Sequence, residues 1–384
     1  MDFEPTPEQK AFREQTRLFA EGAIRPAVSG SVAAGADPAG VLRELGRRRL
    51  MGVALPEGDG GGGRDNVSYV LALVEVTKAC AWTGALMYES NSLYCFSIYA
   101  FGNREQKRKY LHPCVSGEGA GSFDLSAGMP FFRASPSQTT AAKAGGGWIL
   151  NGRHGAVPHG DLCSHCIVTA KVGDGEEMEE PGLFVVNLRN TPGLQFVKAE
   201  TEPCAREAPE VILQDAVLPE NALLERQGEG RSYLDRLIPR GWTGVAARAL
   251  GIGRSVLREA MDQAKGRGPS GKTASRSQTV QWCLADMAVE LDAAELLTLR
   301  AAWFDDEGKP FEKEAAMAKI YASDAAMKAS IEGIRIVREY GYTREHPLDR
   351  HLGHAKTCQV ELGTKEMVRG IVAGYLVTGI KGST

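Results

Sequence analysis

The chain has 384 residues, of which 43% are hydrophobic and 24% charged, so it can bury a substantial core divided over two or three domains. Its formal net charge is −3 and its basic residues are scattered, which excludes the basic surface typical of proteins that bind nucleic acid or anionic membranes. No apolar run approaches the ~20 residues that span a bilayer, and the acidic start lacks a signal-peptide pattern, so we expect a cytoplasmic protein without a membrane partner.

The first part of the chain, residues 1–120, has the pattern of an all-helical domain. Its opening segment starts with Thr6, Pro7 and Gln9, which are an N-cap, a first-turn proline and a capping-box partner. Apolar residues then recur at helical spacing, and the same spacing returns in residues 41–56, 67–82 and 92–102. We therefore predict a helical N-terminal domain.

The sequence pattern changes at about residue 121 and again at about residue 228. Short β-rich runs bounded by Gly, Asn and Pro predict a small antiparallel β domain over residues 121–227; they cover 148–153, 166–172, 182–188, 194–199 and 211–219. Long helical segments at 244–264, 278–304 and 311–337 then predict a four-helix bundle over residues 228–384. The fold class expected from this order is α+β.

The segment 154–166, HGAVPHGDLCSHC, concentrates histidine and cysteine in one short run. His154, His159, Cys163 and Cys166 have a loosely zinc-like spacing. Strand alternation would point residues three apart to opposite faces, although a β-bulge could bring them together. We predict no metal site here. The eight cysteines are dispersed, which favours reduced thiols over disulfides.

Several longer strings resemble the acyl-CoA dehydrogenase family over essentially the whole chain; they lie at 101–123, 148–153, 246–260, 267–278, 284–291, 341–350 and 363–376. The resemblance implies a flavoprotein oxidoreductase with FAD between the β domain and the C-terminal bundle. A carboxylate removes the α-proton of an acyl-CoA or acyl-carrier thioester, the β-hydride passes to flavin N5, and an electron-transfer flavoprotein takes the electrons. It also implies a homodimer or homotetramer joined through the C-terminal helices.

Five residues match the family's FAD contacts, and the resemblance assigns them to cofactor binding: Ser126, Arg267, Gln278, Gly363 and Thr364. Arg267 and Gln278 correspond to the family's Arg-x-x-Phe-Gly and the Gln that follows it, with serine in place of the phenylalanine. A guanidinium suits a diphosphate, so Arg267 would either reach the FAD pyrophosphate across the dimer or be a solvated cation at a helix end.

Other FAD contacts of the family are replaced in this chain. The family's Trp-Ile-Thr-Asn corresponds to residues 155–158, which have neither the aromatic ring nor the threonine hydroxyl. The family's Gln-x-x-Gly-Gly corresponds to Arg335, Arg338 and Glu339, so two charged side chains replace two glycines where backbone approaches the adenosine. We therefore expect weak FAD binding.

The family's catalytic carboxylate is also replaced. The glutamate that precedes Gly-Thr in many members is Leu362 here, and the base position of a second branch is Gly241, next to Arg240, which we assign to the substrate. Glu361 lies one residue early, which rotates its side chain by ~100°; it is either the base or a surface or salt-bridged carboxylate. The backbone N–H of Leu362 can still polarise a thioester carbonyl.

Two classes of function follow from these replacements. The first is an acyl-CoA-processing enzyme with a non-standard base, weakened α,β-dehydrogenation, or a non-oxidative elimination that needs no such base. The second is a catalytically degenerate paralogue that serves as a structural or regulatory subunit, in a hetero-oligomer with an active paralogue.

Overall fold

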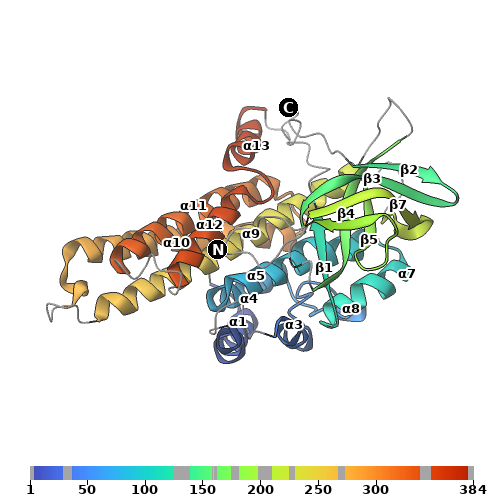
Figure 1. Cartoon of the computed structure of the whole chain (residues 1–384). Coiled ribbons are helices and arrows are strands. Elements are labelled where there is room, and N and C mark those ends of the chain that lie inside the picture. Colours follow the sequence, from blue (N-terminus) through green and yellow to red (C-terminus); the bar gives the residue numbers. More distant parts are fainter. Residues whose placement is uncertain are drawn as a thin grey trace. The chain divides into compact units, whose positions relative to one another are not determined.

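The computed structural model describes residues 4–28, 37–124, 139–157, 159, 162–173, 181–197, 210–224, 230–266, 273–337 and 347–378. They form two compact units, each built from distant parts of the chain (Figure 1). The first unit combines Met1–Ala36, Asp65–Ala85 and Trp242–Thr384, and the second combines Asp37–Arg64 and Leu86–Gly241. Helices flank a β-rich middle segment, so the predicted fold class is confirmed. The division into 1–120, 121–227 and 228–384 stays a prediction.

The first unit is helical. Its elements are α1 (Pro7–Phe19), the π-helix η1 (Ala20–Ile24), α2 (Arg25–Val28), α4 (Asn66–Ala79), the first part of α5 (Ala81–Tyr88), α9 (Gly230–Lys265) from Trp242 onward, the short 3₁₀-helix η6 (Ala274–Arg276), α10 (Gln278–Asp306), α11 (Glu312–Val337), α12 (Pro347–Val360) and α13 (Lys365–Thr378). The predicted capping box of α1 is present, with Thr6 and Gln9 bonded to each other's backbone N–H.

Long helices of the C-terminal segment pack side by side in this unit (Figure 1). The side of α10 that faces them has the usual stripe of three- and four-residue steps, with Met287, Leu291, Ala294 and Thr298 buried. Gly253 of α9 allows a close approach, because a Cβ there would lie 2.4 Å from a methyl carbon of Leu291. Small residues at such contacts let helix axes come close together.

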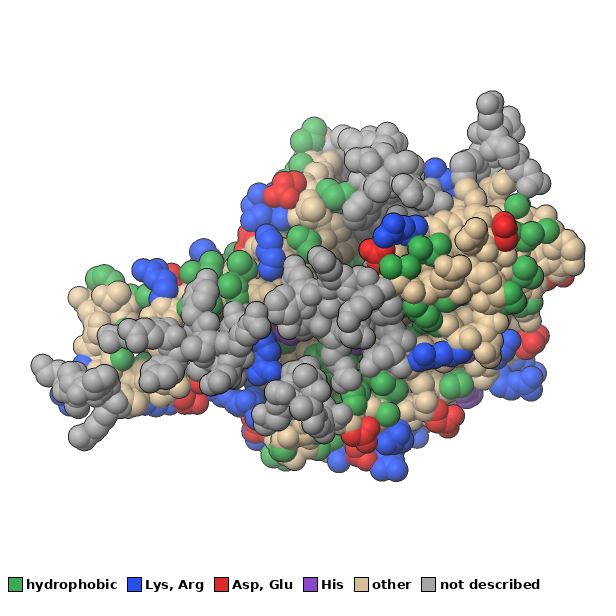
Figure 2. Space-filling model, in the orientation of Figure 1, with side chains coloured by type: hydrophobic (Ala, Val, Ile, Leu, Met, Phe, Trp, Pro, Cys, Tyr) green, Lys and Arg blue, Asp and Glu red, His purple; other side chains and the backbone are tan. Residues whose placement is uncertain are grey.

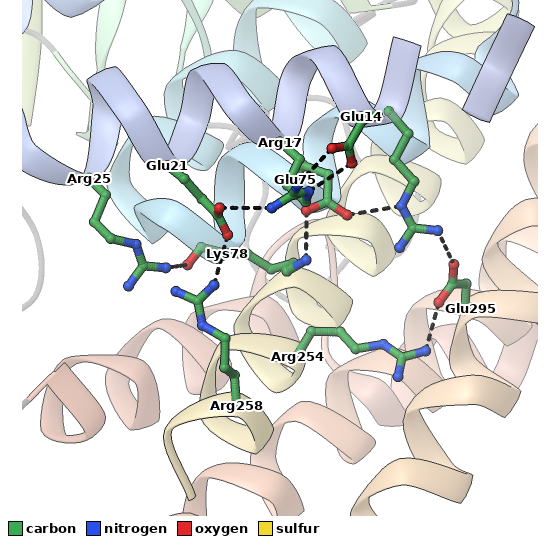
Figure 3. A network of polar contacts seen from close by, with 10 residues as sticks. Glu14, Arg17, Glu21, Arg25, Glu75, Lys78, Arg254, Arg258 and Glu295 are labelled. Atoms are coloured by element: carbon green, nitrogen blue, oxygen red, sulfur yellow. Dashed lines mark hydrogen bonds and ion pairs between the residues drawn. The ribbon is translucent and has the colours of Figure 1, made fainter. Parts of the chain in front are cut away.

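An ionic network joins the N-terminal helices to the C-terminal ones within the same unit (Figure 3). Glu75 of α4 accepts hydrogen bonds from Arg13 at 2.9 Å and from Lys78 at 2.6 Å, and its side chain is only 2% exposed. Arg13 also reaches Glu295 of α10 at 3.2 Å, where Arg254 of α9 binds at 2.7 Å. Shared partners in a network hold one another in place, which an isolated surface pair does not do.

The second unit holds the sheet. Its helices are α3 (Pro38–Arg47), η2 (Glu57–Asp59), the last part of α5, the π-helix η3 (Glu89–Cys95), α6 (Phe96–Phe101), α7 (Arg104–Gln106), the π-helix η4 (Lys107–Leu111), α8 (His112–Val115), η5 (Glu220–Ala222) and α9 up to Gly241. Its strands are β1 (Ala120–Asp124), β2 (Thr140–Ala144), β3 (Gly147–Ala156), β4 (Cys163–Val172), β5 (Pro181–Asn187), β6 (Leu194–Val197) and β7 (Glu210–Pro219).

The sheet is mixed, which differs from the antiparallel β domain expected from the sequence. Hairpin-like pairs β2–β3, β3–β7, β4–β5 and β6–β7 are antiparallel, whereas β1 and β2 both pair with β4 in parallel. Parallel neighbours need a long crossover connection, and residues between β1 and β4 supply one. Short β-rich runs in the sequence do not reveal such crossovers, because the runs look the same in both senses.

The described surface mixes charges of both signs with apolar groups. On the face drawn in Figure 2, Lys and Arg side chains are interspersed with Asp, Glu and hydrophobic ones. Among the helices that the structure describes, we find none that combines the length and the apolar character needed to cross a bilayer.

Candidate active site

The turn between α12 and α13, residues 361–364, contains the two residues that the sequence singles out for catalysis. Leu362 has φ 54° and Gly363 has φ 103°, so the chain reverses through two left-handed residues in a row. This conformation suits glycine but strains leucine. A branched residue stays there only when surrounding contacts hold the backbone in place.

Two buried donors supply those contacts. The indole Nε1–H of Trp242 donates to the carbonyl of Leu362 at 2.8 Å, and the Nζ of Lys319 donates to the carbonyl of Gly363. Trp242 is fully buried and Lys319 is 1% exposed. Burial lowers the pKa of Lys319 to about 8, and the nearby charge of Glu361 opposes this effect. The turn is therefore fixed at two consecutive carbonyls by donors from α9 and α11.

Glu361 is engaged in an ion pair. Its carboxylate accepts a hydrogen bond from Arg248 Nη1 at 2.5 Å, and the side chains of Arg248 and Glu361 are 4% and 20% exposed. The backbone N–H of Glu361 donates to the carbonyl of Thr357 at 2.9 Å, which ends α12 in a regular turn. Of the two readings left open by the sequence, this is the geometry of a salt-bridged carboxylate.

Leu362 presents an apolar side chain where the family's base would lie. The backbone N–H of Leu362 has no hydrogen-bond acceptor in the part of the chain that the structure describes. A donor fixed in direction by the anchored turn is the kind of group that stabilises negative charge on a carbonyl oxygen.

Three of the five predicted cofactor residues lie in the described chain. Gln278 is exposed and begins α10, whose preceding Ser277 makes no side-chain cap. Thr364 precedes α13, and hydrogen bonds from the backbone N–H of Glu366 and from the Thr364 hydroxyl lower the pKa of Glu366. Two helix N-termini thus carry the predicted residues, and such ends suit phosphate groups. Ser126 and Arg267 lie outside the described residues.

The residues that replace the family's FAD contacts lie only partly within the described chain. Arg335 ends α11 as an exposed side chain that pairs with Glu332 one turn earlier, at 2.7 Å. The two other charged residues of that motif, Arg338 and Glu339, are outside the described chain, and so are the side chains of residues 155 and 156.

Arg240, the predicted substrate residue, belongs to the second unit, in α9. Its guanidinium carbon lies 3.9 Å from the ring centroid of Phe96, which is a cation–π contact. The contact accounts for the position of the side chain without a substrate, and the substrate role stays a prediction.

The segment 154–166 has a different geometry from the one expected. The register of β4 against β1 shifts between Ala120 and Gly121, which leaves Ser164 as an extra residue, and Cys163 and Cys166 are both fully buried. This bulge interrupts the regular alternation between Cys163 and Cys166, so their spacing alone no longer implies opposite faces. Even so, we find no group of three potential metal ligands among the described residues. That the segment holds no metal stays a prediction.

Sequence reasoning missed three residues of this site. Arg248, Trp242 and Lys319 are 113, 120 and 44 residues from their partners in the turn, as their numbers show. Nothing in the local pattern distinguishes them from other helical residues. The only available signal was the presence of a tryptophan and two cations at buried helical positions.

Comparison with known proteins identifies the family at both ends of the chain. The C-terminal domain model of acyl-CoA dehydrogenases matches residues 228–376, and the N-terminal domain model matches residues 6–118. The human mitochondrial short-chain specific acyl-CoA dehydrogenase is 35% identical over 363 residues, which are 94% of this chain and 88% of that protein.

Solved structures give the same result. Butyryl-CoA dehydrogenase from Megasphaera elsdenii is 32% identical with a TM-score of 0.89, covering 98% of this chain and 100% of that one. A glutaryl-CoA dehydrogenase from Mycobacterium smegmatis in complex with FADH2 is 26% identical with a TM-score of 0.88, covering 99% and 97%. The chain belongs to the acyl-CoA dehydrogenase family.

Proposed function

We propose that this chain is a flavin-dependent oxidoreductase that binds an acyl-CoA or acyl-carrier thioester at the turn 361–364, and that its own α,β-dehydrogenation is weak. The observation that carries the proposal is the turn itself: its backbone is held for carbonyl binding, while Leu362 replaces the base and Glu361 is tied to Arg248. The backbone of these four residues would therefore bind the thioester although none of their side chains serves as the base.

The polarising role would fall to the backbone. The N–H of Leu362 would donate to the thioester carbonyl, which acidifies the α-carbon because the developing enolate oxygen gains a fixed donor. Trp242 and Lys319 would keep that donor aligned, since each holds a carbonyl of the turn. Neither role needs a side chain at residue 362.

Glu361 is poorly suited to act as the base. To accept a proton it must lose its charge, and Arg248 would then be buried without this counterion. Hydrogen bonds to charged groups contribute about 1.5–3 kcal/mol, and at about 2 kcal/mol the loss of this pair would cost roughly one to two orders of magnitude in rate. Loss of a general base costs about 10²–10⁴-fold, so recruiting Glu361 would recover only part of that loss.

FAD fits the described part of the predicted site. The residues that would hold it are Gln278 and Thr364 at their helix N-termini, Gly363 beside them, and Ser126 and Arg267 in the rest of the chain. A Cβ at Gly363 would meet only a methyl of Val368 at 3.7 Å, so the backbone there is open to close approach. When bound, a flavin supplies the acceptor for the hydride that leaves the β-carbon.

A second candidate is a catalytically degenerate subunit that pairs with an active paralogue. The ion pair between Arg248 and Glu361 favours it, because the carboxylate nearest to the turn already has a structural use. In this reading the chain would bind thioester or cofactor but leave proton removal to its partner.

Self-association would use the outer face of α10. Trp282, Val289, Leu296 and Trp303 repeat every seven residues there, with 62%, 68%, 50% and 44% of each residue exposed. Such a stripe on the side opposite the buried one is typical of a helix that packs against another helix. We propose that a second copy of this chain covers it, in a homodimer or homotetramer. We also propose the cytoplasm as location, from the sequence pattern, and an electron-transfer flavoprotein as acceptor, from the family.

The test is a gain of function at the turn. FAD-loaded protein would be mixed with butyryl-CoA, and bleaching of the flavin absorbance would be followed for the wild type, Leu362→Glu and the uncharged control Leu362→Gln. We expect slow or absent bleaching in the wild type, and a rise of about 10²-fold or more in Leu362→Glu only. Rapid bleaching by the wild type contradicts weak dehydrogenation. Failure of butyryl-CoA and FAD to bind at all contradicts the enzyme reading.

A further inference from the structure

One strand position in the sheet is interrupted, and a histidine bridges the interruption. β5 occupies one edge of β4 from His165 to Lys171, so β1 and β2 must share the other edge. β1 ends with Asp124 opposite Val168, and β2 begins with Thr140 opposite Lys171. β1 therefore ends and β2 begins only a few residues apart along the same edge of β4.

His154 of β3 contacts both ends of the interruption. Its Nδ1 is bonded to the carboxylate of Asp124, and its Nε2 lies 2.8 Å from the hydroxyl of Thr139. His154 is fully buried and Thr139 is 1% exposed. Thr139 also accepts a hydrogen bond on its carbonyl from Lys171 at 2.9 Å, so it is already paired with the edge of β4.

The neighbouring backbone is shaped for this arrangement. A Cβ on Gly152 would lie 2.1 Å from the hydroxyl oxygen of Thr139, so only glycine lets Thr139 approach β3 so closely. The bridge also tolerates either charge state of His154. A neutral ring donates to Asp124 and accepts from Thr139, and a protonated ring donates to both.

The order carboxylate, imidazole, hydroxyl is also the order that activates a nucleophile. Thr139 is too buried for that role, because a hydroxyl on a residue that is 1% exposed cannot meet a thioester carbonyl in this conformation. The arrangement is therefore better explained as a structural link between strands than as an activated nucleophile.

We propose that His154 is a positioning residue that clasps the end of β1 to the start of β2, and so fixes the positions of Asp124 and Thr139, the described residues on either side of residues 125–138. These residues include Ser126, which the resemblance assigns to the flavin. The clasp would thus set where the cofactor contact begins, and this second part rests on the proposed function. Asp124, Thr139 and His154 would act together, with Gly152 making room.

Hydrogen exchange of the ligand-free protein tests the clasp, with mass spectrometry of peptic fragments as the readout. In His154→Gln, fragments that cover 139–144 and 168–172 should exchange about tenfold faster, because local opening follows the loss of hydrogen bonds to a charged group. Fragments from β5 should be unchanged, since they pair with the other edge of β4. Thr139→Val removes the hydroxyl that His154 contacts and should give the same local effect, which covers the case that His154→Gln does not fold.

The matched control is His165→Gln. His165 lies on β4, contacts the hydroxyl of Ser164 at 2.9 Å and has no part in the clasp. It should leave exchange at 139–144 as in the wild type. Unchanged exchange in both His154→Gln and Thr139→Val overturns the clasp, and so does an acceleration that is uniform over all strands.

A second measurement separates the clasp from the cofactor. Quenching of flavin fluorescence would give the Kd for FAD, which should rise about tenfold in His154→Gln but not in His165→Gln. An unchanged Kd beside faster local exchange overturns the link to FAD. If the wild type itself binds no FAD, the proposed function as a flavoprotein is contradicted. The hydrogen-exchange experiment still tests the clasp in that case.

Discussion

Removal of the Glu361 charge should destabilise the fold without touching the chemistry. Glu361→Gln keeps the shape and one acceptor oxygen but removes the negative charge that pairs with Arg248, whose side chain is 4% exposed. Hydrogen bonds to charged groups contribute about 1.5–3 kcal/mol, and the 20% exposure of the Glu361 side chain favours the lower half of that range. We therefore expect the free energy of unfolding to fall by about 2 kcal/mol.

The double variant Arg248→Met with Glu361→Gln extends this test to a double-mutant comparison. Replacing both members of a buried pair with uncharged groups is often nearly neutral, so the double variant should regain most of the lost stability. The assay is urea unfolding followed by circular dichroism. Its matched control is Glu290→Gln, because Glu290 pairs with Lys328 at the same 2.5 Å while the lysine side chain is 68% exposed. An exposed pair should contribute less than about 1 kcal/mol.

Flavin reduction by butyryl-CoA completes the test. If the pair is structural, Glu361→Gln leaves the residual rate of the folded, FAD-loaded protein unchanged. The reasoning is refuted by the opposite pattern, in which Glu361→Gln is as stable as Glu290→Gln and abolishes flavin reduction. Glu361 would then be the base, and its bond to Arg248 would be broken in the complex with substrate.

Three further outcomes are expected. The pKa of Lys319 is lowered to about 8 from an ordinary value of 10.5, so between these pH values the unfolded state binds more protons than the folded state. The free energy of unfolding should therefore rise with pH in this range, by up to about 3 kcal/mol. Urea titrations at pH 8 and pH 10 should show this rise in the wild type and not in Lys319→Met. Leu296→Glu places a charge in the exposed α10 stripe and should lower the mass measured by light scattering, whereas an unchanged oligomer, or a wild-type monomer at micromolar concentration, contradicts the stripe as an interface. Elemental analysis should find no stoichiometric zinc, and one zinc per chain that is lost in His154→Ala or Cys163→Ala would overturn this prediction.

Local signals in the sequence were sufficient for the elements and for the family. The capping box around Thr6 is formed as predicted, because its partners are three residues apart and need no tertiary contact. The replacement of the base by Leu362 is likewise readable from the string before Gly363 and Thr364. The parallel pairing of β1 and β2 with β4 was not readable, because strand sense depends on where the chain returns.

The same limit applies at the level of single side chains. The regular alternation assumed between Cys163 and Cys166 is interrupted by a bulge at Ser164, which depends on the pairing with β1 and cannot be predicted from the segment itself. The predicted contacts at Ser126 and Arg267 are still sequence inferences, since these residues lie outside the described chain.

By itself the sequence determined that the chain has helical ends around a β segment and that it resembles acyl-CoA dehydrogenases, and this resemblance predicts that Leu362 replaces the family's carboxylate. Only the tertiary structure decided what became of the neighbouring charge. Glu361 and Arg248 are far apart along the chain, and whether a carboxylate is a base or half of an ion pair depends on which group folding brings within hydrogen-bond distance. The same holds for His154, whose two ring nitrogens find Asp124 and Thr139 only after β1, β2 and β3 have assembled.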